Sequence, residues 1–346
     1  MGPRLSVCIP THNRADLLRR TLRSLAAIQP CPGVAWEIIV VANCCEDDTL
    51  RVVKNIAPEI PVPLVLLEEM EKGVVAARNR AVRQASGEII AFLDDDVQVS
   101  PLWLRELLNT FDAEQPDVMV GRIYLDWHGL SKPMWFDASM GQYLAQVDLG
   151  DIPMLLQNPL GAAANLAITR DMLQRTGEFR CPLERCGKRT AGEDTDLIAR
   201  AMRLNGRVLY APAVTVSHYV APARLTVRYL RGVAFDVGMA EYLMSPHVKP
   251  GELAANLVKK IPRLIERSLR WLLVFPFHRR AAAHLRVSVA KTRGNIRGLL
   301  LCICRGVLRR RTIVPLVRAG LTERPAKIVS GNLAVPSDDF MPRPHG

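Results

Sequence analysis

The chain has 346 residues and a net charge of +12, with 49% hydrophobic and 23% charged residues. This balance excludes a disordered or collagen-like chain and provides enough apolar surface for a sizeable core. Residues 1–219 hold 23 Lys/Arg against 27 Asp/Glu, whereas residues 220–346 hold 23 against 7. The basic excess therefore lies wholly in the C-terminal third, where it can attract nucleic acid or an anionic membrane surface.

The cysteines and the apolar runs indicate the cellular setting. The eight cysteines form no C-x-x-C pair, and their scatter favours reduced thiols over a structural zinc site. No secretory leader is expected, because a strand follows Met1 almost directly. The apolar runs at 271–277 and 299–304 are too short to cross a bilayer. The sequence therefore predicts a cytoplasmic protein.

The first half of the chain alternates between strand and helix patterns. Strands are predicted at 5–9, 36–41, 63–67, 88–93 and 118–124, and helices at 14–27, 48–56, 73–85 and 101–111. This order at short spacing predicts an α/β fold with a doubly wound, mostly parallel sheet flanked by helices. Residues 126–159 interrupt the rhythm, and their aromatic side chains either form a small local core or stack on a sugar or lipid. Regular structure then resumes at 161–168, with a helix at 195–204 and strands at 207–210 and 214–218.

Three acids, Asp94, Asp95 and Asp96, directly follow the predicted strand at 88–93. Open α/β sheets bind ligands at the carboxyl ends of their parallel strands. Adjacent carboxylates repel one another unless a cation or a basic group neutralises them, so a divalent metal that holds phosphate is a natural partner. The alternative is a solvated acidic turn.

Four further blocks accompany the acids in a fixed order: SVCIPTHNR at 6–14, VVANCCEDDT at 40–49, EKGVVAARN at 71–79 and GEDTDL at 192–197. Together the five blocks resemble the inverting nucleotide-sugar glycosyltransferases of family 2, which have the GT-A fold. The resemblance implies a nucleotide-diphosphate sugar as donor, Mg²⁺ or Mn²⁺ as cofactor, and a saccharide or lipid-linked hydroxyl as acceptor.

By this resemblance, one group of residues binds the donor nucleotide: Pro10, Thr11, Asn13, Asn43, Arg78, Asp94 and Asp95. Ala42 stands where many members have an acid that reads uracil, and Asn43 is its candidate substitute, so the nucleotide base stays open. Arg78 can pair with the diphosphate or with the acidic triplet, unless it is an ordinary surface arginine. Asp47 and Thr49 either cap the next helix or contact the ligand.

The resemblance also assigns the metal and the catalytic base. Asp96 is expected to coordinate the metal, together with His218 at the end of its strand, although a strand-end histidine can be purely structural. Asp194 is the candidate base that takes the proton of the acceptor hydroxyl, with Glu193 as second choice. The alternative is that both acids only favour a helix N-terminus. The small residues at 161–165 resemble a segment that lines the donor-sugar site, or they pack closely against a helix.

The C-terminal third shows helices at 222–242 and 252–274 but no catalytic motif. Ile296, Leu300, Ile303 and Val307 form an apolar stripe with arginines at 305 and 309–311 around it. This helix either lies on an anionic membrane surface or packs on the catalytic domain. We therefore predict a GT-A domain at 1–219, a helical basic extension at 220–324 and a disordered tail at 325–346.

The function that this pattern predicts is inverting sugar transfer in envelope polysaccharide or glycolipid assembly, at the inner face of the membrane. A retaining transferase or a sugar-nucleotide pyrophosphorylase on a similar sheet is the first alternative, although residues 10–14 lack the Gly-rich loop of the latter. The second is a non-catalytic protein that binds nucleotide-sugar or nucleic acid. Few aromatic residues alternate with the basic ones, so nucleic acid is not expected.

Overall fold

The computed structural model describes residues 2–180, 192–243, 250–275 and 277–313, with the backbone alone at 250–254 and 304–313. Within these ranges nine strands form one sheet in the order β3-β2-β1-β4-β8-β6-β9-β5, with β7 beside β9. The strands are β1 Leu5–Thr11, β2 Trp36–Asn43, β3 Leu64–Glu69, β4 Ile89–Phe92, β5 Val97–Val99, β6 Val118–Asp126, β7 Met154–Leu155, β8 Leu166–Thr169 and β9 Val208–Tyr219. The helices of this part are α1 Ala15–Ala26, α2 Thr49–Ile56, α3 Val74–Gln84, α4 Trp103–Glu114, α5 Arg170–Thr176 and α6 Glu193–Arg203.

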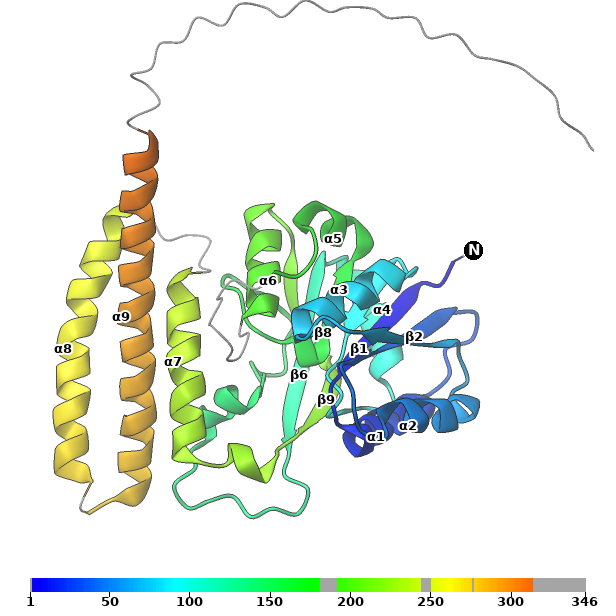
Figure 1. The fold of residues 1–346 in the computed structure, drawn as a ribbon, viewed down its shortest axis with the longest axis horizontal. Helices are drawn as coiled ribbons and strands as arrows, with labels where there is room; N and C mark the ends of the chain where they lie inside the picture. Colours follow the sequence, from blue (N-terminus) through cyan, green and yellow to red (C-terminus); the bar gives the residue numbers. More distant parts are fainter. Residues whose placement is uncertain (1, 181–191, 244–249, 276, 314–346) are drawn as a thin grey trace, which may run out of the picture. The chain divides into compact units, whose positions relative to one another are not determined.

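The first four strands make the parallel half of the sheet. β1 pairs in parallel with β2 and β4, and β2 pairs in parallel with β3. α1 and α2 pack together on one side of these strands, and α3 covers β1 and β2 from the other (Figure 1). β2 and β3 lie on one side of β1, and β4 lies on its other side. The strand order therefore reverses between β1 and β4, which is the topological switch point where open α/β sheets bind ligands. The predicted fold class is confirmed.

The second half of the sheet mixes directions. β8 runs antiparallel to β4 and β6, whereas β9 runs parallel to β6 and antiparallel to the short β5. The two strands predicted at 207–210 and 214–218 are one strand, β9, and its register against β6 shifts between Gly121 and Arg122. The buried Asn165 secures this irregularity, because its amide donates to the carbonyl oxygens of Arg122 and Val214 at 3.0 and 2.9 Å.

The aromatic residues within 126–159 form a small separate core, as one of the two sequence interpretations predicted. Phe136 and Tyr143 pack in this core with Leu230 of α7 (Val227–Leu243) and with Val287 of α9 (Arg279–Ile313). The short 3₁₀ helix Ala138–Leu144 belongs to the same core. These contacts attach the C-terminal helices to the segment that follows β6.

The C-terminal helices α7, α8 (Pro250–Val274) and α9 pack as a group. α7 and α9 cross closely at glycines, since a Cβ at Gly294 would collide with the carbonyl oxygen of Phe235. α8 lies along α9 (Figure 1), where Lys260 Nζ is 3.2 Å from Asn295 Oδ1. The chain divides into two units, of which the first comprises residues 1–304 and contains the elements named above up to Cys304 of α9.

Two sequence predictions about this part stay open. The predicted boundary between 219 and 220 stays a prediction, and the predicted tail at 325–346 lies outside the described residues. Across the described ranges, no helix combines the length and the apolar character needed to span a bilayer.

Candidate functional site

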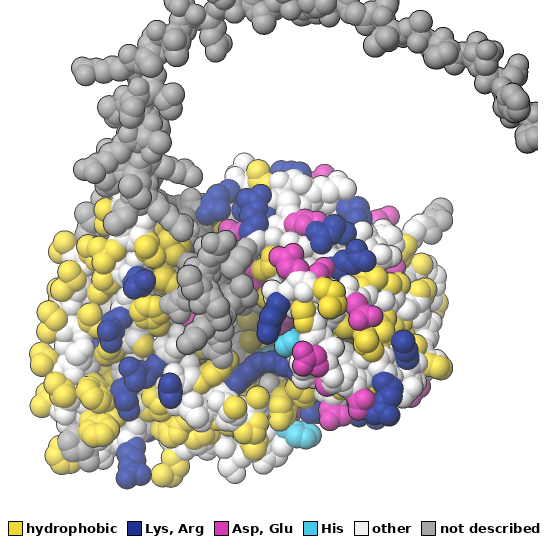
Figure 2. Space-filling view, viewed as in Figure 1, with side chains coloured by type: hydrophobic (Ala, Val, Ile, Leu, Met, Phe, Trp, Pro, Cys, Tyr) yellow, Lys and Arg dark blue, Asp and Glu magenta, His cyan; other side chains and the backbone are white. Residues whose placement is uncertain are grey.

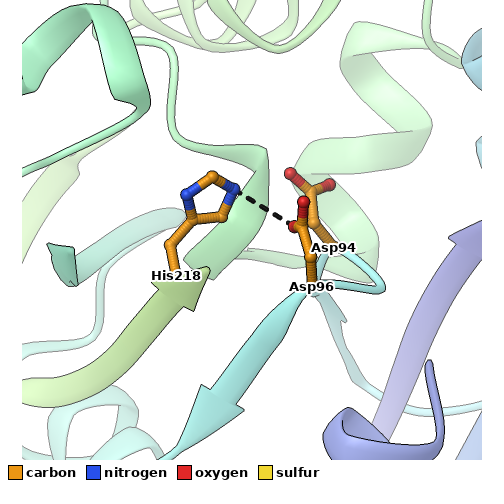
Figure 3. Close-up of side chains that lie close together, drawn as sticks. All are labelled: Asp94, Asp96 and His218. Carbon is orange, nitrogen blue, oxygen red and sulfur yellow. Dashed lines mark ion pairs between the residues drawn. The ribbon is translucent and has the colours of Figure 1, made fainter. Parts of the chain in front are cut away.

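The acidic triplet lies in the turn between β4 and β5, next to the carboxyl end of β1. β5 pairs antiparallel with the end of β9, so that Val97 stands opposite His218. This pairing places the imidazole beside the acids, and His218 Nε2 lies 3.1 Å from Asp96 Oδ1 (Figure 3). Sheet register therefore brings together the two predicted metal residues, which are far apart in the sequence.

Asp94 joins these two residues in a possible set of metal donors. One ligand atom from each of Asp94, Asp96 and His218 lies within 4.8 Å of the other two, and the three side chains converge (Figure 3). Asp96 Oδ1 and His218 Nδ1 are buried and have no aligned hydrogen bond within the described residues. Carboxylate oxygens suit Mg²⁺ and Mn²⁺, and imidazole nitrogen is a further accepted donor for transition metals. The donor set therefore fits a small divalent cation.

Two arginines neutralise the acids in this structure. Arg14 Nη1 lies 2.8 Å from Asp95 Oδ1 and 3.0 Å from Asp96 Oδ2, and Arg224 Nη2 lies 3.5 Å from the same Asp96 oxygen. Burial raises the pKa of Asp96, but His218, Arg14 and Arg224 outweigh it and bring that pKa to about 2. Burial raises the pKa of Asp95 to about 6 in spite of Arg14. Asp96 thus stays ionised at a lower pH than Asp95.

Asp95 is turned toward the carboxyl end of β1. Thr11 Oγ1 donates to Asp95 Oδ2 at 2.8 Å, and Thr21 Oγ1 donates to the Asp95 carbonyl oxygen at 2.9 Å. Both Thr11 and Asp95 are buried, so these side chains brace the triplet against β1 and α1. Contact of Thr11 or Asp95 with a nucleotide stays a prediction.

Pro10 and Asn13 shape the loop that follows β1. Pro10 is buried near the carboxyl end of β1, where it pairs with Val41 of β2 but lies beyond the β4 register, which ends at Cys8. Asn13 adopts a positive φ of 52°, and its Oδ1 accepts from the backbone N–H of Glu46 at 2.7 Å. Asn13 thereby ties the β1 loop to the loop after β2. A nucleotide contact by either residue stays a prediction.

Asn43, the last residue of β2, holds the loop that follows β3. Asn43 Nδ2 donates to the carbonyl oxygens of Glu69 and Glu71 at 3.0 and 2.7 Å, and its Oδ1 accepts from Gly73 N–H at 2.8 Å. Gly73 has a φ of 137°, which a residue with a Cβ rarely adopts. The Asn43 amide is therefore engaged in holding the start of α3, and reading of a base by Asn43 stays a prediction.

Asp47 caps the helix that follows it, which is one of the two roles that the sequence allowed. Its Oδ1 accepts from Thr49 N–H at 3.1 Å at the start of α2, and its Oδ2 accepts from Ala15 N–H at 3.0 Å at the start of α1. Burial raises the pKa of Asp47, but the hydrogen bonds from Thr49 and Ala15 together outweigh it and leave the pKa lowered. Asp47 therefore holds the beginnings of both helices.

Arg78 joins the acidic triplet to the block at 192–197. Its Nη1 donates to Glu193 Oε1 at 2.5 Å and its Nη2 donates to Asp94 Oδ1 at 3.0 Å. Arg78 is 3% exposed, so the interpretation as an ordinary surface arginine is wrong. Burial lowers the pKa of Arg78, but Glu193 and Asp94 outweigh it and raise the pKa. One buried guanidinium thus connects two motifs that stand far apart in the sequence.

Asp194 and Glu193 open α6 but lie in different surroundings. Glu193 is buried, and burial raises its pKa although Arg78 opposes the rise. Asp194 is half-buried, and its Oδ2 accepts from the backbone N–H of Ala163 at 3.0 Å. A Cβ at Gly161 would lie 3.3 Å from both Asp194 oxygens, so small residues at 161–165 let this segment approach the start of α6. Asp194 is the more accessible of the two acids, and its role as base stays a prediction.

Sequence reasoning gave no role to two arginines that contact the acids. Arg14 stands within the first block, and a basic residue at the end of a strand beside an acidic triplet was a usable signal. Arg224 follows β9 in the short 3₁₀ helix Pro222–Arg224 and lies beyond all five blocks. Arg224 lies next to Asp96 because β9 pairs with β5. No local sequence pattern predicts this contact.

The family is established by comparison with known proteins. The model of the family described as "Glycosyl transferase family 2" matches residues 6–146, which include β1, the triplet and Arg78. Residues 6–146 form a glycosyl transferase family 2 domain. Within this glycosyltransferase, the block at 192–197 lies outside the matched residues, and the three-dimensional contact between Arg78 and Glu193 attaches it to them.

Curated relatives of this glycosyltransferase carry names from polysaccharide biosynthesis. The succinoglycan biosynthesis protein ExoM of Rhizobium meliloti is 27% identical over 237 residues, which cover 68% of this chain and 72% of that protein. The succinoglycan biosynthesis protein ExoO of the same organism is 26% identical over 310 residues, covering 83% of this chain and 85% of that protein. Both similarities extend beyond the part that the family model matches.

The fold of this glycosyltransferase is GT-A. A solved structure, the mannosyltransferase PcManGT from Pyrobaculum calidifontis in complex with GDP-Man and Mn²⁺, covers 92% of this chain and 82% of its own chain. Its TM-score is 0.53 at 17% sequence identity, so the likeness concerns the fold alone.

Proposed function

We propose that this glycosyltransferase moves a sugar, with inversion, from a nucleotide-diphosphate sugar to a hydroxyl of a saccharide or lipid-linked acceptor. The process it serves is envelope polysaccharide or glycolipid assembly at the cytoplasmic face of a membrane. The observation that carries the proposal is the contact of Arg78 with both Asp94 and Glu193. This contact supports the proposal because one buried arginine links an acid of the proposed donor site to Glu193, the neighbour of the proposed base Asp194.

The donor end of the reaction is assigned to the β4–β5 turn. Asp96, His218 and Asp94 are the residues that would hold a divalent cation. Such a cation supplies positive charge that stabilises the departing diphosphate. Arg14 and Arg224 already lie within 3.5 Å of Asp96 and add positive charge at the same place. Positive charge fixed in advance where negative charge develops is a large part of catalysis of this kind.

The acceptor end is assigned to the start of α6. Inversion needs one base, which takes the acceptor proton while the acceptor oxygen bonds to the anomeric carbon and the bond from that carbon to the diphosphate breaks. Asp194 is the better candidate, because Glu193 is buried and paired with Arg78, whereas Asp194 is half-exposed. Ala163 N–H holds one Asp194 oxygen, which orients the carboxylate. Proton transfer to a positioned carboxylate accounts for roughly 10²–10⁴ in rate.

A screen of donor nucleotides tests the proposal. The full-length protein is melted with UDP-, GDP- and dTDP-sugars, each with and without Mn²⁺. We expect one donor class to raise the melting temperature only with Mn²⁺, since a ligand at 100 times its Kd stabilises a protein by about 2.7 kcal/mol. The product formed from that donor should have the inverted anomeric configuration by NMR. A melting temperature that no donor changes, or a product with retained configuration, would contradict the proposal.

A further inference from the structure

Exposed hydrophobic side chains are concentrated on one helix. Of the seventeen large hydrophobic residues exposed in the described part of the chain, eight lie between Val258 and Phe277. They are Val258, Ile261, Ile265, Leu269, Leu272, Leu273, Phe275 and Phe277. All of them belong to α8 or to the segment directly after it. Single exposed apolar residues are ordinary on protein surfaces, but a contiguous set marks an interaction surface.

The exposed residues of α8 share one face of the helix. Five of them follow one another at spacings of three and four residues, which keeps them within ~120° of the helix circumference. Leu273 lies at the edge of the same arc. We call Val258, Ile261, Ile265, Leu269, Leu272 and Leu273 the outer face of α8.

The other side of α8 packs on α9. Arg267 Nη1 donates to Thr292 Oγ1 at 2.7 Å, and the guanidinium of Arg286 lies 5.6 Å from the centre of the Trp271 ring. Trp271 and Lys260, which contacts Asn295, are only half-exposed. α8 therefore has apolar residues on two sides, and α9 covers one of them. The outer face has no cover among the described residues.

Basic side chains border the outer face. Lys259, Arg263 and Arg270 follow it along one edge of the helix, and all three are exposed. Glu266 is the one acid among residues 255–275, and Arg270 pairs with it at 3.1 Å. Figure 2 shows hydrophobic side chains gathered over the region of α8, with Lys and Arg side chains among them. The helix thus joins a broad apolar face to a positively charged edge.

The end of α8 continues the same pattern. Phe275 is 54% exposed and Phe277 is 79% exposed, and His278, Arg279 and Arg280 follow at once. Exposed aromatic rings next to basic residues suit the boundary between lipid headgroups and acyl chains.

We propose that the outer face of α8 docks on an anionic lipid bilayer, with the helix lying in the plane of the interface. The apolar arc enters the boundary between headgroups and acyl chains, and Lys259, Arg263 and Arg270 contact acidic headgroups. A second copy of the chain is a poorer occupant, because an antiparallel two-fold contact through this face would bring the basic edges together. The assignment is independent of the transfer reaction, since it involves no residue of the candidate site.

The proposed membrane contact lies on α8, whereas the sequence indicated the apolar stripe of α9 as the membrane-binding surface. On α9, Ile296 and Ile303 are half-buried and Leu300 is exposed. The side chains of Val307 and of the arginines at 305 and 309–311 lie outside the described residues. The described apolar surface is therefore larger on α8.

Vesicle sedimentation of the full-length protein tests the proposal. We expect binding to phosphatidylcholine vesicles that contain phosphatidylglycerol, and little binding to phosphatidylcholine alone. Binding should weaken as salt rises from 0.1 M to 1 M, because the Debye length falls from about 10 Å to about 3 Å. Equal binding to neutral and anionic vesicles, or no binding to either at low salt, overturns the proposal.

Two groups of variants separate the apolar face from the basic edge. Ile265→Ser with Leu269→Ser should lower the partition coefficient more than about tenfold, because buried methylene groups supply most of the interfacial binding. Lys259→Gln, Arg263→Gln and Arg270→Gln together should lower it on the order of 100-fold, at about fivefold for each charge. All five residues are exposed, so the melting temperature should stay close to that of the wild type.

Matched substitutions elsewhere on the surface are the controls. Met134→Ser with Ile152→Ser changes two exposed apolar residues outside α8, and Arg51→Gln with Arg83→Gln changes two exposed cations of the GT-A part. Both control variants should bind vesicles as the wild type does. If the Ile265/Leu269 variant also binds like the wild type, the face is wrongly assigned. If light scattering shows a wild-type dimer that this variant dissociates while vesicle binding is unchanged, the occupant is a second copy and the proposal fails.

Discussion

The GT-A part of the chain and helix α8 place their apolar and charged side chains in opposite ways. Around the sheet, apolar residues are buried and charged residues meet at the strand ends, where Arg78 lies between Asp94 and Glu193. On α8, apolar residues face outward and charges border them. Buried charges persist only when they are paired, and an exposed apolar face persists only at some cost in solubility. The charged residues at the strand ends therefore mark a binding site for a polar ligand. The apolar face of α8 marks a binding site for an apolar surface.

The largest effect is expected from substitution of Asp96, which is a proposed ligand of the cation. Asp96→Ala should lower Mn²⁺-dependent nucleotide affinity by more than about 100-fold, because it removes a proposed cation ligand and the partner of Arg14 and His218. The pKa of Asp96 is about 2, so the substitution removes a full negative charge at neutral pH. Calorimetric titration of nucleotides with and without Mn²⁺ measures the change.

Asp16→Ala is the matched control for this variant, since the Asp16 side chain is 89% exposed and lies on α1. It should bind nucleotides as the wild type does. An Asp96→Ala protein that melts like the wild type and keeps its Mn²⁺-dependent affinity for every nucleotide tested would remove Asp96 from the metal site.

The next effect separates the two acids at the start of α6. Asp194→Asn should lower kcat by roughly 10²–10⁴-fold and leave donor affinity nearly unchanged, because it removes the basic oxygen and touches no proposed donor contact. Glu193→Gln should affect the rate less but lower stability by about 1–3 kcal/mol, because it weakens the buried pair with Arg78. Steady-state kinetics and thermal melting distinguish the two outcomes.

Asp171→Asn provides a control at another helix start, because Asp171 lies in the first turn of α5 with a side chain 75% exposed. Neither its rate nor its melting temperature should change much. Wild-type turnover in Asp194→Asn together with an inactive Glu193→Gln would exchange the two roles. If both variants turn over normally, the base lies elsewhere and inversion by Asp194 is wrong.

The sequence predicted the parallel half of the sheet because long apolar runs and helical periodicity mark these elements strongly. β1, β2, β3 and β4 all lie within a few residues of their predicted positions. β5 was not predicted, since a strand of three residues carries almost no periodic signal. Yet the pairing of β5 with β9 is what places His218 beside Asp96. The predicted residues were therefore brought together by an element that the sequence could not reveal.

The C-terminal third shows a different limit of sequence reasoning. Helical periodicity identified α8, but apolar residues lie on two of its sides, and periodicity does not tell which side a neighbour covers. The contact of Trp271 with Arg286 decides this, and that contact depends on how α9 returns along α8. Likewise, the motifs at 71–79 and 192–197 indicated two functional segments, but the Arg78–Glu193 pair between them is a product of the fold.

The smallest effect concerns Arg224, a residue beyond β9 that reaches the candidate site. Arg224 Nη2 lies 3.5 Å from Asp96 Oδ2, and the Arg224 side chain is 22% exposed. Arg224→Gln should weaken nucleotide-diphosphate binding by a few-fold, about 1 kcal/mol, because it removes one partly solvated positive charge. It should also strengthen Mn²⁺ binding in the absence of nucleotide, because Arg224 no longer competes for the Asp96 carboxylate.

Calorimetry with Mn²⁺ alone and with nucleotide measures both binding constants. The control is Arg228→Gln, which changes an exposed arginine on α7 and should alter neither constant. A purely structural role would lower both affinities together, whereas two unchanged affinities would mean that Arg224 plays no part in the donor site. Opposite changes would show that the segment after β9 contributes a positive charge to the donor site.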